Sequence, residues 1–254
     1  MPLLIWVITF TFLGSVASLI GGVFLLWKAD LIEGKTHFLV AFAAGAMLAA
    51  SFLALLPEGF KEAKSEEFMP ISAAVLFGVV TFFFLERFIA WFHHHACPDG
   101  EECEGSAPTI PLLVIGDSLH NFLDGIVISS SFLLSIPVGI VASIAVFFHE
   151  IPHEMGNFGV LLHLKMQKIN VLLVNLLSAF FAFLGAFLAF FFLNNLKFLI
   201  PFLVAFAAGN FIYIAASDLI PELHRSFKRQ IAVSQSLSFL MGILIIILAI
   251  RIFA

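Results

Sequence analysis

Eight stretches of mostly apolar residues run along the chain, separated by short polar connections. They lie at residues 3–27, 38–56, 70–91, 109–133, 137–161, 171–193, 198–220 and 232–253. An α-helix needs about 20 apolar residues to cross the hydrocarbon core of a bilayer, and each stretch approaches or exceeds that length. The first lacks a preceding basic segment and is too long for the apolar core of a cleaved signal peptide, so we count it as a helix. The pattern predicts an all-α polytopic membrane protein with eight transmembrane helices.

Two of these stretches carry an internal repeat. Residues 41–58 read AFAAGAMLAASFLALLPE and residues 205–222 read AFAAGNFIYIAASDLIPE, with eight of eighteen positions identical. They belong to the second and seventh stretches, which cross a membrane in opposite directions, and such inverted repeats are typical of secondary transporters. The repeat predicts a 3+2+3 arrangement within one transmembrane transporter domain over residues 1–254, with helices 1–3 and 6–8 as inverted copies. The alternative is a shared preference for Ala and Gly in helix packing, although Pro57 and Glu58 also match Pro221 and Glu222.

The composition agrees with a chain embedded in a lipid bilayer. Hydrophobic residues make up 61% of the chain and charged residues 11%, with a mean hydropathy of +1.10. An ordinary soluble domain has about 25% charged residues, so this chain exposes too much apolar surface for a single soluble core. The net charge of −5 and the lack of a basic patch argue against a nucleic-acid partner.

The basic residues favour one orientation in the membrane, because Lys and Arg collect in cytoplasmic loops. With the N-terminus outside, the inner side collects Lys28, Lys35, Lys165, Lys168, Arg225, Lys228 and Arg229. We therefore expect a multi-pass protein of the plasma (inner) membrane with both termini extracytoplasmic. The oligomeric state stays open, with a homodimer as one option.

The longest polar connection, residues 92–108, contains His93–His95, Cys97 and Cys103 among acidic residues. In this orientation it is a cytoplasmic loop. It could bind metal loosely, because Cys-x5-Cys is not a structural zinc pattern, or it could be a solvated acidic segment. The sequence leaves both interpretations open.

Two polar clusters interrupt the fourth and fifth apolar stretches. They are His120-Asn121-Phe122-Leu123-Asp124-Gly125 and His149-Glu150-Ile151-Pro152-His153-Glu154. Ionisable residues inside a bilayer are costly and by default mark an ion or substrate pathway. A single buried histidine is usually a hydrogen-bonded core residue, but so many on two apolar helices make that explanation weak.

Helical spacing indicates how these side chains can meet, because residues three or four apart share a helix face. One point can collect a tetrahedral nitrogen and oxygen set suited to zinc, namely His120, Asp124, His149 and His153. A second point can collect Asn121, Asp124, Glu150 and His153, with Asp124 and His153 bridging. Asp117, one turn before His120, is a candidate either to extend the ion path or to orient this imidazole as an outer partner. Gly125 and Gly156 are expected to allow close helix approach. A structural rather than transported metal is the alternative.

An enzyme is the main competing interpretation. Residues 149–153 satisfy H-E-x-x-H, in which two histidines bind zinc and the glutamate is a general base. Residues 123–125 resemble the LDG motif of intramembrane metalloproteases. However, the LDG precedes H-E-x-x-H here, Pro152 lies inside the motif, and His120 and Asn121 would fill the position that a catalytic zinc keeps open for water. A metal sensor that does not transport is a third interpretation, but it would not need eight helices.

The two motifs HNFLDG and HEIPHEMG resemble those of the ZIP (Zrt/Irt-like) divalent metal transporters, in particular the branch with a HEIPHE-type signature. The resemblance covers the whole chain, and the short loops favour a prokaryotic-type member. It implies zinc uptake into the cytoplasm, with Fe²⁺, Mn²⁺ or Cd²⁺ in some members, and no enzymatic activity. It also implies that the two ligand sets form a binuclear centre, and that Met47 is an additional weak ligand. Asn157 and Ala54 depart from residues that the family often has at these positions.

Overall fold

The computed structural model describes residues 2–32, 36–61, 68–95, 109–193, 196–224 and 229–253, and the described chain contains helices and no strands. The long helices are α1 (Leu3–Thr11), α2 (Ile20–Ile32), α3 (Thr36–Ala50), α5 (Phe68–His95), α6 (Thr109–Leu134), α7 (Ile136–His163), α8 (Lys168–Leu193), α9 (Ile200–Ile214) and α11 (Arg229–Phe253). Shorter elements are the π-helical segments η1 (Phe12–Val16), η2 (Ser51–Leu55) and η5 (Ala215–Leu219), the 3-10 turn η4 (Lys197–Leu199), and the helices α4 (Leu56–Lys61) and α10 (Ile220–His224). The all-α prediction is confirmed.

Seven helical segments within the described residues are long and apolar enough to cross a membrane. They are Leu3–Trp27, Thr36–Lys61, Phe68–Arg87, Ile136–Leu162, Lys168–Leu193, Lys197–His224 and Ile231–Phe253. Large apolar side chains such as Phe77, Phe192 and Leu237 are exposed on these helices, as expected for a surface that faces lipid. The fourth predicted stretch forms helix α6, whose apolar content is reduced by its polar cluster and by Ser129–Ser131, and α6 is not among the seven.

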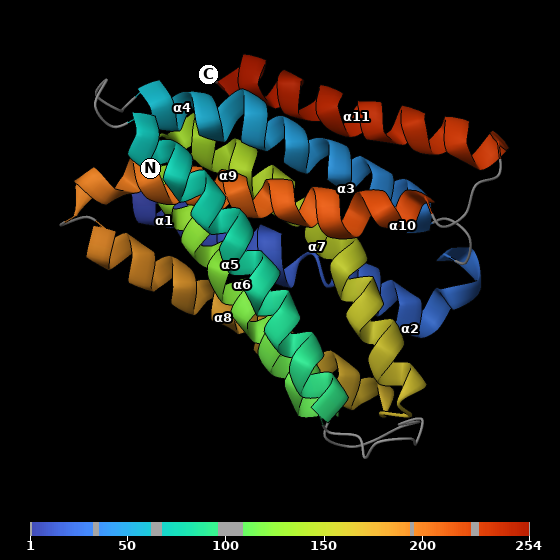
Figure 1. The fold of residues 1–254 in the computed structure, drawn as a ribbon. Coiled ribbons are helices and arrows are strands. Elements are labelled where there is room, and N and C mark those ends of the chain that lie inside the picture. The colour runs from blue at the N-terminus through green and yellow to red at the C-terminus, as the bar shows by residue number, and fades with distance from the viewer. Residues whose placement is uncertain are drawn as a thin grey trace.

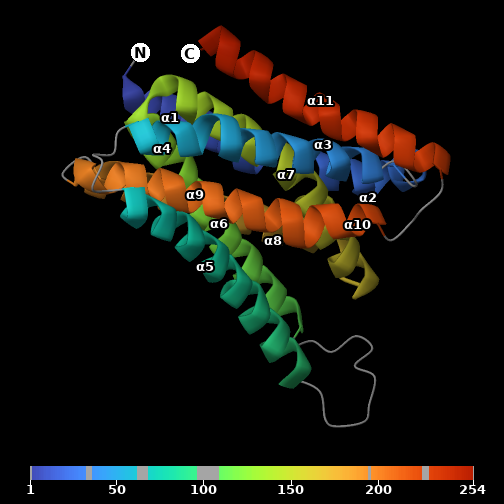
Figure 2. The same cartoon turned by 45° about the horizontal axis from the view of Figure 1, so that its top comes forward.

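Two long helices that contain the repeat run side by side in opposite directions. In Figure 1 the blue helix α3 leads to α4 at one end of the molecule, whereas the orange helix α9 leads to α10 at the other end, and Figure 2 shows the same from another side. Helix α11 packs on α3, and α5 packs on α9. Helix α8 packs on α6, and helix α2 packs on α7. Each of the two helices with a polar cluster therefore has a different neighbouring helix packed on it.

Matched glycines allow the flanking helices to approach α3 and α9. A Cβ atom on Gly45 would lie 2.1 Å from the carbonyl oxygen of Phe239 in α11. A Cβ atom on Gly209, the equivalent residue in the repeat, would lie 2.1 Å from the carbonyl oxygen of Val75 in α5. Only glycine fits at either position, because real Cβ contacts are essentially never shorter than 3.0 Å. The repeated AFAAG sequence thus has the same packing role twice.

The repeat also extends to an irregularity of the backbone. The segments η2 and η5 occupy equivalent positions, and each is followed by a proline, Pro57 or Pro221. In η2 the amide of Leu56 donates to the carbonyl oxygen of Ser51, and in η5 the amide of Ile220 donates to that of Ala215. Because proline lacks an N–H donor, it breaks the regular hydrogen-bond ladder one turn earlier, where each π segment lies.

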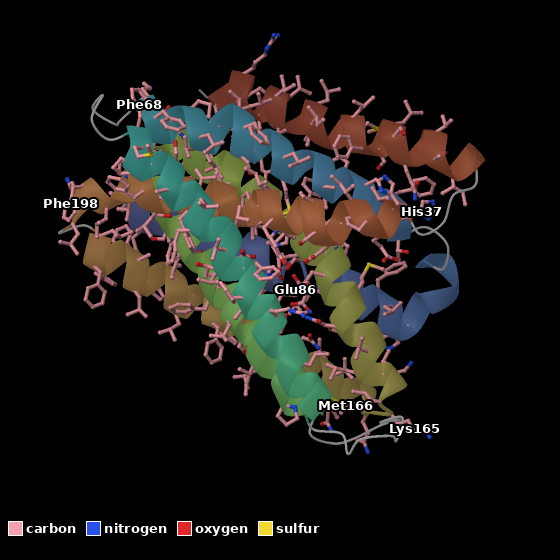
Figure 3. The ribbon with its side chains drawn as sticks, viewed as in Figure 1. His37, Phe68, Glu86, Lys165, Met166 and Phe198 are labelled. Atoms are coloured by element: carbon pink, nitrogen blue, oxygen red, sulfur yellow. The ribbon has the colours of Figure 1, made fainter. Side chains whose placement is uncertain are left out.

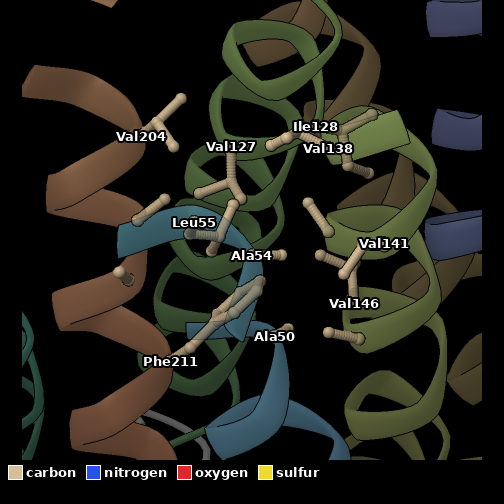
Figure 4. Close-up of a cluster of buried hydrophobic side chains, with 14 of the residues drawn as sticks. Ala50, Ala54, Leu55, Val127, Ile128, Val138, Val141, Val146, Val204 and Phe211 are labelled. Carbon is tan, nitrogen blue, oxygen red and sulfur yellow. The ribbon is translucent and has the colours of Figure 1, made fainter. Parts of the chain in front are cut away.

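An apolar core joins α3, η2, α6, α7 and α9, as Figure 4 shows. Its residues include Ala54, Val127, Ile128, Val141 and Phe211, all buried. In α6 these residues follow the polar cluster, and in α7 they precede it. The core therefore seals one side of the polar region formed by the two helices.

Candidate metal centre

The connection between α6 and α7 brings their polar clusters to the same level. A single residue, Ser135, separates the two helices, and its Oγ accepts a hydrogen bond from the amide of Val138. Asp124 lies 11 residues before Ser135 and His149 lies 14 residues after it. Because a helix rises about 1.5 Å per residue, two adjacent antiparallel helices place these residues at similar heights.

Four side chains converge at this level. His120, Asp124, His149 and Glu150 are all buried, and each offers one potential ligand atom within 4.8 Å of the others. His120 Nε2 lies 3.2 Å from His149 Nε2, 3.1 Å from Glu150 Oε1 and 3.8 Å from Asp124 Oδ2. His149 Nε2 lies 3.3 Å from Asp124 Oδ2 and 3.4 Å from Glu150 Oε1. We call these residues the four-ligand group.

The geometry of the four-ligand group fits a transition-metal ion. Ligand atoms about 2.1 Å from a tetrahedral ion lie about 3.4 Å from each other, close to the separations found here. His149 Nδ1 donates to the carbonyl oxygen of Ala145 at 3.2 Å, which leaves Nε2 as the ring atom with a free lone pair. Asp124 Oδ2 and both carboxylate oxygens of Glu150 are buried without a hydrogen-bond partner. Buried oxygens without partners are costly, and a bound cation would offset that cost.

The structure brings three residues of the first predicted set together, with Glu150 in place of the predicted His153. The ring of His153 stacks on that of His120, with centroids 4.5 Å apart and an interplanar angle of 18°. Its Nδ1 lies 3.8 Å from Glu150 Oε1. His153 therefore borders the four-ligand group without belonging to it.

The other predicted residues lie at different distances from this group. Asn121 is fully buried, and its Nδ2 donates to the carbonyl oxygen of Asp117 at 3.2 Å while its Oδ1 has no partner. Asp117 lies beside His153, with 3.7 Å between Oδ1 and Nδ1, and not beside His120 as a hydrogen-bond partner. Met47 is fully buried among the apolar residues of the core, and its role as a weak ligand stays a prediction.

Gly125 behaves as expected and Gly156 does not. A Cβ atom on Gly125 would lie 1.9 Å from the carbonyl oxygen of Ala182 in α8, so this glycine is required for the contact between α6 and α8. A Cβ atom on Gly156 would meet nothing within 4 Å. The prediction that Gly156 serves close helix packing is therefore wrong.

Two cavities reach the region. The first, of about 200 Å³, is lined by Phe82, Leu85, Glu86, Leu113, Gly116, Asp117, His120, His153, Asn157, Tyr213, Ile214 and Asp218. The second, of about 210 Å³, is lined by Val40, His149, Pro152, His153, Ile214, Asp218, Leu219 and Glu222. His153 and Asp218 line both cavities. Figure 3 shows Glu86 of α5 near the middle of the molecule, where Tyr213 donates to its Oε2 at 2.5 Å.

Some polar residues of this region were given no role from the sequence, although Glu154 was named as part of the second polar cluster. Glu154 is fully buried in α7, and neither of its carboxylate oxygens has a hydrogen-bond partner. Asp218 could have been singled out, because the repeat pairs it with Ala54 and only Asp218 is charged. Glu86 gave no signal, since an acidic residue near the end of an apolar stretch is ordinary. The predicted loop 92–108 begins on α5, which extends to His95, and its residues 96–108 lie outside the described residues.

Comparison with known proteins identifies the family. The family model described as "ZIP Zinc transporter" matches residues 2–109 and 93–249. Human "Zinc transporter ZIP10" is 36% identical over 144 residues, which cover 52% of this chain and 17% of that protein. Human "Zinc transporter ZIP6" is 39% identical over 119 residues, covering 47% of this chain and 16% of that protein. "Metal cation symporter ZIP14" of Xenopus tropicalis is 41% identical over 117 residues, covering 46% of this chain and 25% of that protein. The matched part of the chain thus spans a quarter or less of the length of these relatives. The family model covers most of this chain, so the chain belongs to the ZIP zinc transporter family.

Proposed function

We propose that this chain carries Zn²⁺ across a membrane and binds it as substrate between α6 and α7. One observation carries the proposal, namely the buried four-ligand group, in which two imidazoles and two carboxylates lie within 4.8 Å of one another. Neutral imidazoles suit zinc and related divalent ions, and the two carboxylates supply the charge that offsets dehydration of a dication. Members of the ZIP family are zinc transporters and not enzymes, which argues against the metalloprotease interpretation.

The proposal includes an eight-helix membrane domain over residues 1–254, in which α6 crosses the membrane in addition to the seven helical segments described above. Support for the 3+2+3 inverted repeat comes from the opposite directions of α3 and α9, the equivalent glycines Gly45 and Gly209, and the equivalent π segments η2 and η5. An inverted repeat allows a central site to open alternately to either side. Polar side chains of α6 reach a cavity, which is where charged residues in a membrane helix are tolerated.

The direction of transport, the branch and the location follow from the sequence. The distribution of Lys and Arg favours extracytoplasmic termini in a plasma (inner) membrane, with zinc uptake into the cytoplasm. Residues 149–154 favour the HEIPHE branch, and the prokaryotic type stays a prediction, while the relatives named above are animal proteins. Transport of Fe²⁺, Mn²⁺ or Cd²⁺ and assembly as a homodimer also stay predictions.

Zinc influx into proteoliposomes tests the proposal. The purified protein would be reconstituted into vesicles that contain a fluorescent zinc indicator, and compared with His149→Ala and His224→Ala. We expect influx above that of protein-free vesicles, a loss of about tenfold or more for His149→Ala, and wild-type influx for the control His224→Ala. His224 is a suitable control because it lies at the exposed end of α10, outside both cavities of the centre.

Two results would oppose the proposal. Vesicles whose protein binds zinc but admits none would show a binding protein and not a transporter. Equal influx through the wild type and His149→Ala would show that zinc does not pass the four-ligand group.

A further inference from the structure

His153 lies at the edge of the four-ligand group. Its Nδ1 is buried and has no hydrogen-bond partner. This atom lies 3.7 Å from Asp117 Oδ1 and 3.8 Å from Glu150 Oε1. The side chain as a whole is 36% exposed and lines both cavities, so the ring lies between the buried group and the cavity space.

Asp117 is held in place by a residue of the facing helix. Asn157 of α7 donates from Nδ2 to Asp117 Oδ1 at 2.6 Å. Both residues line the first cavity, and the side chain of Asp117 is otherwise buried. A carboxylate oxygen that accepts one hydrogen bond still has a lone pair for a cation, and such outer hydrogen bonds orient metal ligands. Asn157 therefore acts as a positioning residue for Asp117.

The separation of Asp117 Oδ1 and His153 Nδ1 matches that of two ligands on one ion. Two ligand atoms about 2.1 Å from a tetrahedral ion lie about 3.4 Å apart, and the distance here is 3.7 Å. Within the four-ligand group the corresponding distances range from 3.1 to 3.8 Å. A shift of a few tenths of an ångström would therefore suffice to bind a cation here.

We propose a second position for a divalent transition-metal ion, held by Asp117 Oδ1 and His153 Nδ1 at the wall of the first cavity. The inference rests on the proposed function, and it adds the next position at which the transported ion would bind. Glu150 Oε1 connects the two positions, because it lies 3.1 Å from His120 Nε2 in the four-ligand group and 3.8 Å from His153 Nδ1. This position differs from the predicted second set, which used Asn121 and Asp124 and not Asp117.

The second position is the weaker of the two. It has two protein ligands, and water from the cavity completes the coordination, whereas the four-ligand group supplies four protein ligands. A weak site beside a tight one suits transport, since an ion must bind well enough to enter and loosely enough to leave. The pair of positions divides the release of a dehydrated ion into two smaller steps, with water replacing protein ligands at the cavity.

Zinc binding to the purified full-length protein tests the position. Equilibrium dialysis against increasing Zn²⁺, followed by metal analysis, would be performed on the wild type, Asp117→Asn, Asn157→Ala, Asn157→Asp and the control Glu58→Gln. Glu58 lies on α4, pairs with Lys61, and lines neither cavity. Ions that bind elsewhere are common to all these proteins, so the differences between them report on the second position.

We expect Asp117→Asn to bind one ion fewer than the wild type while it keeps the tightest ion. Asn157→Ala should weaken the second ion about 10- to 100-fold, as is usual when an outer hydrogen bond to a ligand is removed. Asn157→Asp adds a carboxylate beside Asp117 and should strengthen the second ion, a gain that misfolding cannot produce. Glu58→Gln should match the wild type.

The inference is overturned if Asp117→Asn binds as many ions as the wild type with the same affinities, or if Asn157→Asp leaves the second affinity unchanged. These outcomes are separate from those of the vesicle assay. If Asp117→Asn binds one ion fewer but the wild type shows no zinc influx, the second position is supported and transport is rejected. If the wild type shows influx but Asp117→Asn binds zinc as the wild type does, transport is supported and the second position is rejected.

Discussion

Replacing Gly125 by alanine should damage both the packing of α6 and the metal centre. The new Cβ would lie 1.9 Å from the carbonyl oxygen of Ala182, 2.7 Å from its carbon and 2.8 Å from the amide nitrogen of Ala186. All three are backbone atoms, which cannot move aside as a flexible side chain can. Because real Cβ contacts are essentially never shorter than 3.0 Å, α6 and α8 must separate by about 1 Å at this point.

The expected magnitude follows from that displacement. Asp124 precedes Gly125 directly and supplies Oδ2 to the four-ligand group. Metal–ligand distances tolerate changes of about 0.2 Å, so a shift of about 1 Å should detach this ligand. We expect zinc affinity to fall at least about tenfold, equivalent to about 1.4 kcal/mol. Overpacking should also lower the free energy of unfolding by about 1–3 kcal/mol.

Gly156→Ala is the matched control, because it lies in the other motif and its Cβ would meet nothing within 4 Å. Alanine there should leave zinc affinity unchanged and add up to about 1 kcal/mol of helix stability. Thermal unfolding in detergent and zinc titration would be measured for both variants. The reasoning fails if Gly125→Ala binds zinc as the wild type does, or if both variants lose stability equally.

Three further predictions concern the scaffold and the bound ion. Gly45→Ala and Gly209→Ala should each cost about 1–3 kcal/mol of unfolding free energy, because both Cβ atoms would lie 2.1 Å from a carbonyl oxygen. If one of the two variants unfolded at the same temperature as the wild type, the two positions would not be equivalent. The single hydroxyl proton of Ser51 is shared between the carbonyl oxygens of Met47, at 2.9 Å, and Ala208, at 3.2 Å. Ser51→Ala should therefore cost about 0.5–1.5 kcal/mol of unfolding free energy, whereas Ser236→Ala, at an exposed position of α11 where the hydroxyl bonds only within its own helix, should change the unfolding temperature little. Zinc at about 100 times its dissociation constant should raise the unfolding free energy by about 2.7 kcal/mol, and a chelator should remove that gain. An unfolding temperature that does not change when zinc is added would exclude a zinc site specific to the folded state.

Much of the fold could be predicted, because helices in a membrane must satisfy their backbone internally and therefore appear as long apolar stretches. The same argument is weakest for α6, where the residues that make the site also reduce the apolar signal. The repeat in the sequence identified equivalent residues such as Gly45 and Gly209. It did not reveal the π segments, since hydrogen-bond register depends on packing and only the prolines at 57 and 221 hint at it.

The residues of the candidate site were named from the sequence, and the structure brings them together in a grouping that differs in part from the expected one. Spacing of three or four residues places Glu150 and His153 on the same face of α7, so either could join His120 and Asp124. The rotation of α7 against α6 decides between them, and it depends on packing along both helices, which spacing does not encode. For the same reason one of the two roles considered for Asp117 paired it with His120, whereas in the structure the facing Asn157 holds it beside His153.

The polar character of α6 has a consequence for how the chain enters a membrane. At the centre of an inserting helix, an aspartate costs about 2.5–3.5 kcal/mol, so Asp117 and Asp124 together would cost about 5–7 kcal/mol. Ser129–Ser131 add little that would compensate. We therefore expect α6 to insert poorly by itself during synthesis and to stay near the protein-conducting channel until α7 and α8 follow. The residues that we propose to bind the substrate would then also delay the assembly of the protein that contains them.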